Sequence, residues 1–203
     1  VAVGAIEKMS KSKKNVVDLD AFISDFGADA ARWFVLSDSP PERDVEYTDS
    51  GVEGVWRFIQ RLWSTVDALP EGAPGPMTVA VDASGPALDA RKAAHKAAAS
   101  VTEAIEGFRF NSAVAQIHDL VNTLRKCSAD DSSSLAARAE SLGILARLIA
   151  PFVPHLAEEC WAHLGGEGLV IDAAWPDADP GLLVENNVTM PIQINGKKRG
   201  ELE

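Results

Sequence analysis

Hydrophobic residues recur every three or four positions along most of the chain, with polar residues between them. The clearest stretch lies between residues 50 and 69, where one face of a predicted helix would be apolar. Its repeating positions are Val52, Val55, Trp56, Ile59, Leu62, Trp63 and Val66. Ser50, followed three positions later by Glu53, predicts a capping box at the start of this helix. We therefore expect a long helix with one buried face.

Similar patterns predict helices on both sides of this stretch. A helix capped by Asp18 or Asp20 is expected to end at Gly27, and another to span residues 29–36. Four more helices are predicted over residues 86–107, 111–126, 132–150 and 154–164. Asn111 is a good N-cap for the second of these four. The predicted fold class is mainly α, a helical bundle.

Two segments depart from the helical pattern. Residues 70–86 are rich in proline and glycine and predict a loop. Residues 189–194 alternate between polar and apolar, Asn195 and Gly196 form a strong hairpin signal, and residues 197–202 would return antiparallel. An isolated hairpin is only marginally stable in water, so we interpret this β-hairpin as the start of a small β-containing module at the C-terminus.

The composition is that of a folded globular protein. Hydrophobic residues make up 46% of the 203 positions and charged residues 24%, which excludes a disordered chain. No apolar run approaches the roughly 20 residues that cross a bilayer, so no membrane association is expected. The two cysteines, Cys127 and Cys160, provide no disulfide framework, which is typical of a cytoplasmic protein.

Charge is distributed unevenly along the chain. The net charge of −11 argues against a protein that coats nucleic acid indiscriminately, because such binding neutralises many phosphates. Residues 1–15, however, contain four lysines and one glutamate, whereas residues 16–49 contain two arginines and nine acidic residues. Positive charge is concentrated at the start and again in residues 191–203, where it can attract an anion locally.

The basic start contains the string Lys8-Met9-Ser10-Lys11-Ser12. A solvated basic loop is the simplest interpretation of such a run. At average residue frequencies, however, the chance of this string in a chain of this length is on the order of one in ten thousand. The string resembles the KMSKS signature loop of class I aminoacyl-tRNA synthetases.

The resemblance covers essentially the whole chain. The later stretches FGADAARWFVL, SPPERDVEYTDSGVEGVWRFIQRLW, RFNSAVAQIHDLVN, LIAPFVPHLAEECWAHLG, AAWPDAD and PIQINGKKRG follow in this order. Together they resemble the C-terminal portion of bacterial leucyl-tRNA synthetases. Valyl and isoleucyl enzymes share the KMSKS loop and a helical domain after it, and are the alternative assignment. The leucyl assignment depends on SPPERD joined to DSGVEG and on the final INGKKRG.

The resemblance implies part of a leucine-tRNA ligase, which activates leucine with ATP and transfers it to tRNA(Leu). Lys8 to Ser12 would bind ATP, with Lys8 and Lys11 as catalytic residues and Lys11 nearest the phosphates. Adenylate formation builds negative charge on the departing pyrophosphate, and mobile ammonium groups can meet that charge. Met9 would anchor the loop, while the hydroxyls of Ser10 and Ser12 add donors.

The resemblance also implies three parts. Residues 1–49 would be the end of a catalytic domain with the KMSKS loop and stem-contact helices, and residues 50–168 an α-helical anticodon-binding domain. Residues 169–203 would be a linker and the start of a C-terminal β-containing domain. The HIGH-type ATP motif, the amino-acid pocket and the editing domain are expected elsewhere, so this segment alone should be inactive.

The expected partners are those of the complete enzyme. We expect ATP with Mg²⁺ and leucine to bind through the missing domains, tRNA(Leu) to bind the helical domain, and the protein to be a monomer. The segment alone is expected to hold no cofactor. Its opening residues should be disordered without the surface that would support the loop.

Basic residues at three places are candidates for tRNA contacts. Arg57 and Arg61 lie one turn apart on the polar side of the helix after Ser50, where they could contact phosphates or simply be solvated. The other candidates are Arg91, Lys92 and Lys96, and the run Lys197, Lys198 and Arg199. Solubility would also explain the first set, and protection of a hairpin edge from aggregation the second.

Two further sets of residues allow either a chemical or a structural interpretation. His155, Cys160 and His163 are spaced so that at most two converge on a short helix, so no metal site is predicted. His155 is expected to serve the start of that helix instead. The tryptophans at 33, 56, 63 and 161 fall on apolar faces, which favours core packing over base stacking.

An alternative function belongs to a different class. The chain could be a non-enzymatic helical interaction module, in which the lysines form a solvated tail and tRNA plays no part. The length and order of the similar stretches favour the synthetase.

Overall fold

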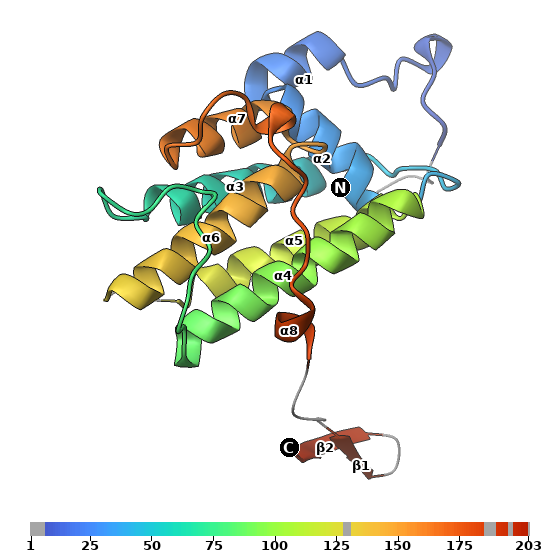
Figure 1. The fold of residues 1–203 in the computed structure, drawn as a ribbon. Helices are drawn as coiled ribbons and strands as arrows, with labels where there is room; N and C mark the ends of the chain where they lie inside the picture. Colours follow the sequence, from blue (N-terminus) through green and yellow to red (C-terminus); the bar gives the residue numbers. More distant parts are fainter. Residues whose placement is uncertain (1–6, 128–130, 185–189, 195–196, 203) are drawn as a thin grey trace.

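Three long helices, α4, α5 and α6, pack against one another and form the centre of the bundle (Figure 1). They span Gly85–Glu106, Phe110–Leu124 and Ser132–Ile149. This computed structural model describes residues 7–127, 131–184, 190–194 and 197–202, and the last two ranges by their backbone only. The prediction of a mainly helical fold is confirmed.

The remaining elements are arranged around this centre. Helices α1 (Leu19–Phe26), α2 (Ala28–Asp38), α3 (Asp49–Asp67) and α7 (Pro154–His163) cover one side of it (Figure 1). Short elements are η1 (Lys11–Lys13), η2 (Val170–Asp172) and α8 (Pro180–Leu183). Strand β1 (Met190–Ile194) pairs antiparallel with β2 (Lys197–Leu202), with an irregularity between Ile192 and Gln193. The predicted turn at Asn195 and Gly196 lies outside the described residues.

The start of α3 differs from the prediction. The hydroxyl of Thr48 accepts a hydrogen bond from the backbone N–H of Gly51 at 3.1 Å, so Thr48 is the N-cap. Ser50 therefore lies inside the first turn, and the capping box predicted for Ser50 and Glu53 is wrong. A threonine two positions upstream satisfies the same free N–H groups that the box would have satisfied.

The start of α5 also differs. Helix α5 begins at Phe110, and Asn111 lies inside it, so the predicted Asn111 cap is wrong. The reason is the short connection from α4, in which the N–H of Arg109 donates to the carbonyl of Ala104 at 2.7 Å. That bond ends α4, and the next residue, Phe110, already belongs to α5.

Asp18, one of the two predicted caps of α1, does cap that helix, because its carboxylate accepts the N–H groups of Asp20 and Ala21.

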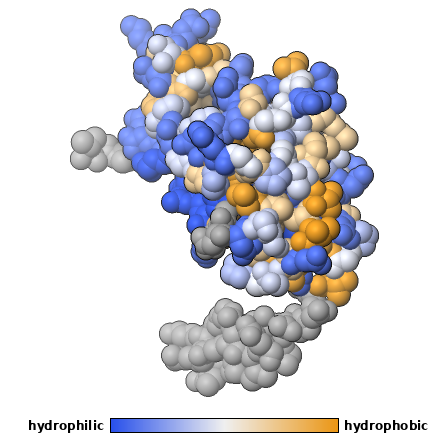
Figure 2. All heavy atoms as spheres, turned by 60° about the vertical axis from the view of Figure 1, so that its left-hand side comes forward, coloured by the Kyte–Doolittle hydropathy of each residue, from blue (hydrophilic) through white to orange (hydrophobic). Residues whose placement is uncertain are grey.

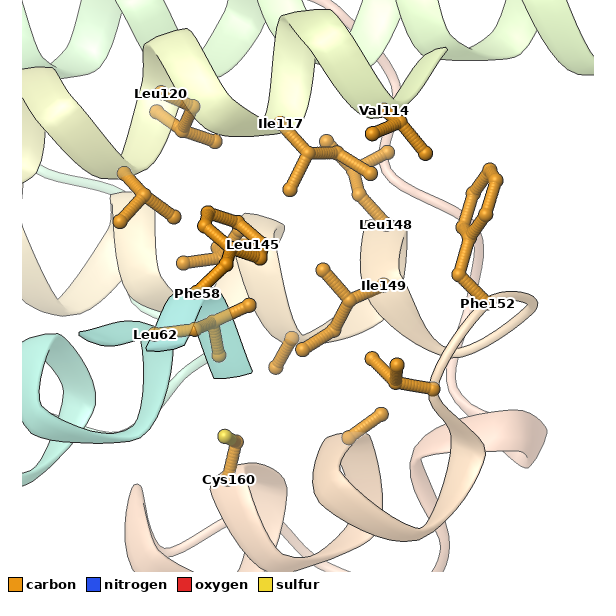
Figure 3. Close-up of a cluster of buried hydrophobic side chains, with 14 of the residues drawn as sticks. Phe58, Leu62, Val114, Ile117, Leu120, Leu145, Leu148, Ile149, Phe152 and Cys160 are labelled. Atoms are coloured by element: carbon orange, nitrogen blue, oxygen red, sulfur yellow. The ribbon is translucent and has the colours of Figure 1, made fainter. Parts of the chain in front are cut away.

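The core is made by side chains from α1 to α7, with mostly alanines from α4. Figure 3 shows Phe58 and Leu62 of α3 facing Ile117 of α5 and Leu145 of α6. The indole of Trp33 on α2 stacks on Phe58, with ring centroids 4.9 Å apart. These apolar contacts are the main source of the bundle's stability.

The tryptophans only partly follow their prediction. Trp33 and Trp161 are buried, and Trp63 is half-buried. Trp56, in contrast, is 38% exposed and lies edge-on to Phe26 with ring centroids 6.3 Å apart. The helical period brings Trp56 to the border of the buried face, where an indole contacts α1 with one edge and water with the other.

The surface in Figure 2 is a mixture of hydrophilic side chains and smaller groups of hydrophobic ones. Within the described residues, no helix is both long enough and apolar enough to span a bilayer. Cys127 and Cys160 are both buried and are not joined by a disulfide. Burial raises the pKa of the Cys160 thiol to about 12, and the charge of Glu159 adds to the effect.

The loop between α3 and α4 lies directly against α6. A side chain at Gly143 would place its Cβ 1.9 Å from the carbonyl oxygen of Pro76. The carboxylate of Glu140, one turn earlier, accepts the backbone N–H of Ala80 at 2.9 Å. The predicted loop is therefore held against α6 at two places, by the close approach of Pro76 to Gly143 and by the hydrogen bond from Ala80 to Glu140.

The close approach at Gly143 predicts the result of a single substitution. Gly143→Ala should lower the free energy of unfolding by about 2 kcal/mol or more, because the added methyl group overlaps a backbone carbonyl that cannot rotate away. Urea denaturation of both proteins measures this difference. Gly54→Ala is the control, since Gly54 is also helical and its Cβ would meet only the end of the Arg57 side chain, at 3.9 Å. Equal stability of Gly143→Ala and the unaltered protein would contradict the close packing.

Candidate functional site

The loop at the start of the chain is a closed turn built from its own polar groups. The N–H of Ser10 donates to Oδ1 of Asn15 at 2.8 Å, and Nδ2 of Asn15 donates to the carbonyl of Lys8 at 3.4 Å. The hydroxyl of Ser10 accepts the N–H of Lys13 at 3.3 Å and lies 3.2 Å from the hydroxyl of Ser12. Ser10 therefore caps η1 and shapes the loop.

The lysines of this loop differ in their partners. The Lys13 ammonium lies 2.9 Å from Oε2 of Glu7. Among the described residues, neither Lys8 nor Lys11 has an ion-pair partner, and both are exposed. Met9 is 42% exposed, so its predicted role as an apolar anchor is not fulfilled within this chain. The loop thus presents two ammonium groups that are available to an anion.

Arg57 and Arg61 lie one turn apart on α3 but differ in exposure and in the groups they contact. Arg57 is exposed and makes only a surface ion pair with Glu53 at 3.4 Å. Arg61 is half-buried, with its guanidinium carbon 5.9 Å from the centre of the Phe58 ring. Burial lowers the pKa of His118, and the positive charge of Arg61 lowers it further. Arg61 therefore faces the bundle, and Arg57 faces water.

The candidates on α4 separate in the same way. Arg91 is only 11% exposed and donates to both oxygens of Glu140, at 2.6 and 3.2 Å. Arg91 is therefore engaged inside the bundle, which argues against its use as a tRNA contact. Lys92 is half-buried and Lys96 is exposed, and both line a hollow with residues 182–184.

The carboxylate of Glu140 is the most strongly held charge in the bundle. Besides Arg91 and the N–H of Ala80, its oxygens lie 3.1 Å from Nε2 of the buried His95. Burial alone would raise the pKa of Glu140. The hydrogen bonds from His95, Arg91 and Ala80, with the charge of Arg91, overcome that effect and lower the pKa to about 2.

The remaining sequence candidates lie apart from this cluster. The side chains of Lys197, Lys198 and Arg199 lie outside the described structure, although their backbone belongs to β2. Cys160 is buried, whereas His155 and His163 are exposed, so the three do not converge. No group of three possible metal ligands occurs among the described residues.

His155 serves the start of α7, as expected. Its Nδ1 lies 2.9 Å from Oδ1 of Asp29, and Oδ2 of Asp29 accepts the N–H of Leu156 at 2.8 Å. A carboxylate from α2 therefore caps α7 across 126 residues of sequence.

Spacing alone did not reveal the Glu140 cluster. Arg91 and His95 are four residues apart on an alanine-rich helix, which places them on one face. Glu140 stands in a helix rich in alanine and leucine, and a charged residue on the buried side of such a helix needs a buried partner. These two signals exist in the sequence, but only the packing of α4 on α6 joins them.

The comparisons with known proteins agree with this architecture. A family model described as the anticodon-binding domain of tRNA ligases matches residues 89–203, and one described as class I tRNA synthetases (M) matches residues 4–56. Because the first match covers more than half of the chain, the chain belongs to the family of tRNA-ligase anticodon-binding domains.

The particular relatives are leucine-tRNA ligases. The chain is 79% identical over its whole length to the leucine-tRNA ligase of Maricaulis maris, and 58% identical to that of Hyphomonas neptunium. It spans 23% of the length of each. A solved LeuRS of Agrobacterium radiobacter K84, in a ternary complex with tRNA and LeuAMS, matches with a TM-score of 0.75 and 30% identity. That match covers 96% of this chain and 26% of the solved chain.

The Glu140 cluster predicts how the stability of the bundle changes with pH. The folded pKa of about 2 lies below the usual 4.5, so the stabilisation is complete above about pH 4.5 and is lost as pH falls toward 2. The shift corresponds to about 3 kcal/mol of unfolding free energy.

Denaturation of the unaltered protein and Glu140→Gln between pH 7 and 3 measures this effect. The variant should be less stable at pH 7, and the gap should narrow as the pH falls. The control Glu53→Gln removes a carboxylate that is 63% exposed and should change stability little. A gap that stays constant with pH would contradict the assignment.

Proposed function

We propose that this chain is the part of a leucine-tRNA ligase that supplies the ATP-facing loop and a helical domain that supports tRNA. The observation that carries the proposal is the full-length similarity to leucine-tRNA ligases, with 79% identity to one of them. The available ammonium groups of the KMSKS loop agree with it. The complete ligase would activate leucine with ATP and transfer it to tRNA(Leu) in the cytoplasm.

The three proposed parts follow the arrangement of the helices. Residues 1–49 contain the loop with α1 and α2, and we assign them to the end of the catalytic domain and its stem-contact helices. Residues 50–168 contain α3 from its second residue onward, together with α4 to α7, and form the proposed tRNA-supporting domain. Residues 169–203 lead through α8 to β1 and β2, which we propose begin a C-terminal β-containing domain.

The donor set of the loop suits a polyphosphate. Lys8 and Lys11 are exposed, and neither ammonium group is neutralised by a described carboxylate. ATP with Mg²⁺ would supply the α-phosphorus that the leucine carboxylate attacks and the pyrophosphate that leaves. The role of Lys11 is to place positive charge beside the departing oxygens, and Lys8 supports it.

The small residues of the loop complete this role. Ser10 and Ser12 hold the turn through their hydroxyls, and their side chains are small. The side chain of Asn15 closes the turn through its hydrogen bonds to the N–H of Ser10 and the carbonyl of Lys8. The loop therefore keeps its shape while the two lysine side chains extend from it.

Substitutions in the complete ligase test the loop. Lys11→Ala should lower the rate of leucine-dependent exchange between ATP and pyrophosphate by about 100-fold, because a charge that acts in the transition state is removed. Lys13→Ala is the matched control, since that ammonium is already paired with Glu7 and should matter much less. Equal losses in the two variants would contradict a specific role for Lys11.

Fluorescence anisotropy of this chain with labelled tRNA tests the helical domain. We expect tighter binding to tRNA(Leu) than to a valine or isoleucine tRNA, and an affinity that falls with salt. Arg57→Gln should weaken binding and reduce the magnitude of the logarithmic salt slope by about one, the change expected for one phosphate contact. Arg125→Gln is the control, an exposed arginine outside the candidate set.

The outcomes separate the possible functions. Equal and feeble binding to all tRNAs would overturn autonomous recognition by this domain. Preference for the valine or isoleucine tRNA would support a relative of the leucyl enzymes instead.

A further inference from the structure

The segment after η2 crosses the bundle and ends at α8, close to the point where the chain continues to β1 and β2. Residues 173–183, here called the strap, run along the outside of α6 and α4 (Figure 1). The strap contains little regular structure apart from α8, so its course is determined by the groups that hold it.

Three hydrogen bonds from the bundle hold the strap. Nη1 of Arg147 donates to the carbonyl of Ala174 at 3.1 Å. Trp175 donates its indole N–H to the hydroxyl of Thr102 at 2.8 Å. The N–H of Asp179 donates to Nδ1 of His95 at 3.0 Å.

These three bonds differ in their exposure to water. The first two are exposed, so water competes for the same groups. The acceptor of the third is the ring of His95, which is only 7% exposed. The bond to His95 is therefore the best protected of the three and the hardest to replace with water.

The geometry also defines the protonation of His95. Because Nδ1 accepts an N–H, it carries no proton, and the neutral ring holds its proton on Nε2. Nε2 then donates to the ionised carboxylate of Glu140, 3.1 Å away. Glu140 thus selects the tautomer of His95 whose other nitrogen can receive the strap.

Asp179 connects His95 to α8. Its backbone N–H bonds to His95, while its carboxylate accepts the N–H of Gly181 at 2.8 Å and caps α8. Helix α8 packs on α4, the helix that carries His95. Asp179 therefore links the end of the strap to both His95 and the start of α8.

We propose that His95 is a positioning residue that fixes the exit of the chain from the helical bundle. Through Asp179 it fixes α8 on α4, the point from which the chain continues toward β1 and β2. We infer that holding this point helps the later segment to contact tRNA. The proposal rests on the function proposed above. The buried Glu140 acts through His95 and does not itself touch the strap.

Two substitutions separate the two bonds of the ring. In His95→Gln, an amide nitrogen can take the place of Nε2 and still donate to Glu140, but no acceptor remains at the position of Nδ1. In His95→Asn, an amide oxygen can take the place of Nδ1 and accept from Asp179, but nothing reaches Glu140. The first variant should release the strap, and the second should retain it.

Hydrogen exchange of this chain gives the first readout. In His95→Gln, the amide of Asp179 should exchange roughly tenfold faster than in the unaltered protein, the loss expected for one shielded hydrogen bond. In His95→Asn, that amide should stay close to its original rate, even if the whole protein is less stable. Unchanged exchange at Asp179 in His95→Gln would overturn the anchor.

Aminoacylation by the complete ligase gives the second readout. His95→Gln should raise the KM for tRNA several-fold and leave kcat nearly unchanged, because the reacting groups are untouched. His95→Asn should restore the KM. Faster exchange at Asp179 without a change in KM would overturn the positioning role.

The two readouts also separate this proposal from the proposed function. If the unaltered complete ligase fails to charge tRNA(Leu), the proposed function is wrong, and so is the role of the strap in tRNA binding. The exchange rate of Asp179 still decides whether His95 anchors the strap.

Discussion

Much of this bundle depends on the hydrogen bonds and the ion pair that the buried carboxylate of Glu140 makes. It lies on α6 and receives donors from the loop before α4 and from two side chains of α4. A carboxylate without these donors would be too costly to bury, and each donor would be unsatisfied without the carboxylate. The group therefore selects one arrangement of α4, α6 and their connecting loop, which apolar contacts alone specify less sharply.

The buried Arg138 joins α6 to α3 and α5 in a similar way, through hydrogen bonds to backbone carbonyls. Arg138 of α6 donates to the carbonyl of Leu124, the last residue of α5, to that of Cys127 just beyond it, and to that of Thr65 near the end of α3. The carbonyls of Leu124 and Thr65 lie in the last turns of their helices, where intrahelical donors are lacking and the dipole is negative. Burial lowers the pKa of Arg138, which shows how far its guanidinium is removed from water. Helix α6 is thus bonded to α4 through Glu140 and to α3 and α5 through Arg138.

The sequence was sufficient for the helices because their signals are local. Apolar spacing predicted the buried face of α3, and Asp18 and Gly27 marked the ends of α1. Caps were less certain, because Thr48 and Ser50 can satisfy the same N–H groups and only the backbone course decides between them. Trp56 shows the same limit, since a periodic pattern identifies a face but not its border. Contacts across more than 40 residues, such as that of His95 with Glu140, depend on tertiary packing that no local pattern encodes.

The availability of a basic residue is likewise a property of its surroundings. Arg91, Arg61 and Lys11 look equivalent in the sequence, yet the first is paired with a buried carboxylate and the second lies over an aromatic ring. Lys11 stands in a string that resembles a known signature, and it is exposed with no ion-pair partner among the described residues. An unpaired, exposed ammonium is what the catalytic role proposed for Lys11 requires, because a charge meant for a ligand must remain available until the ligand arrives. On the helical surfaces no motif marks a site, so the proposed tRNA contacts depend on exposure and partners. Arg57 is exposed and makes only a surface ion pair, whereas Arg61 is half-buried over a ring and Arg91 is held by the buried Glu140.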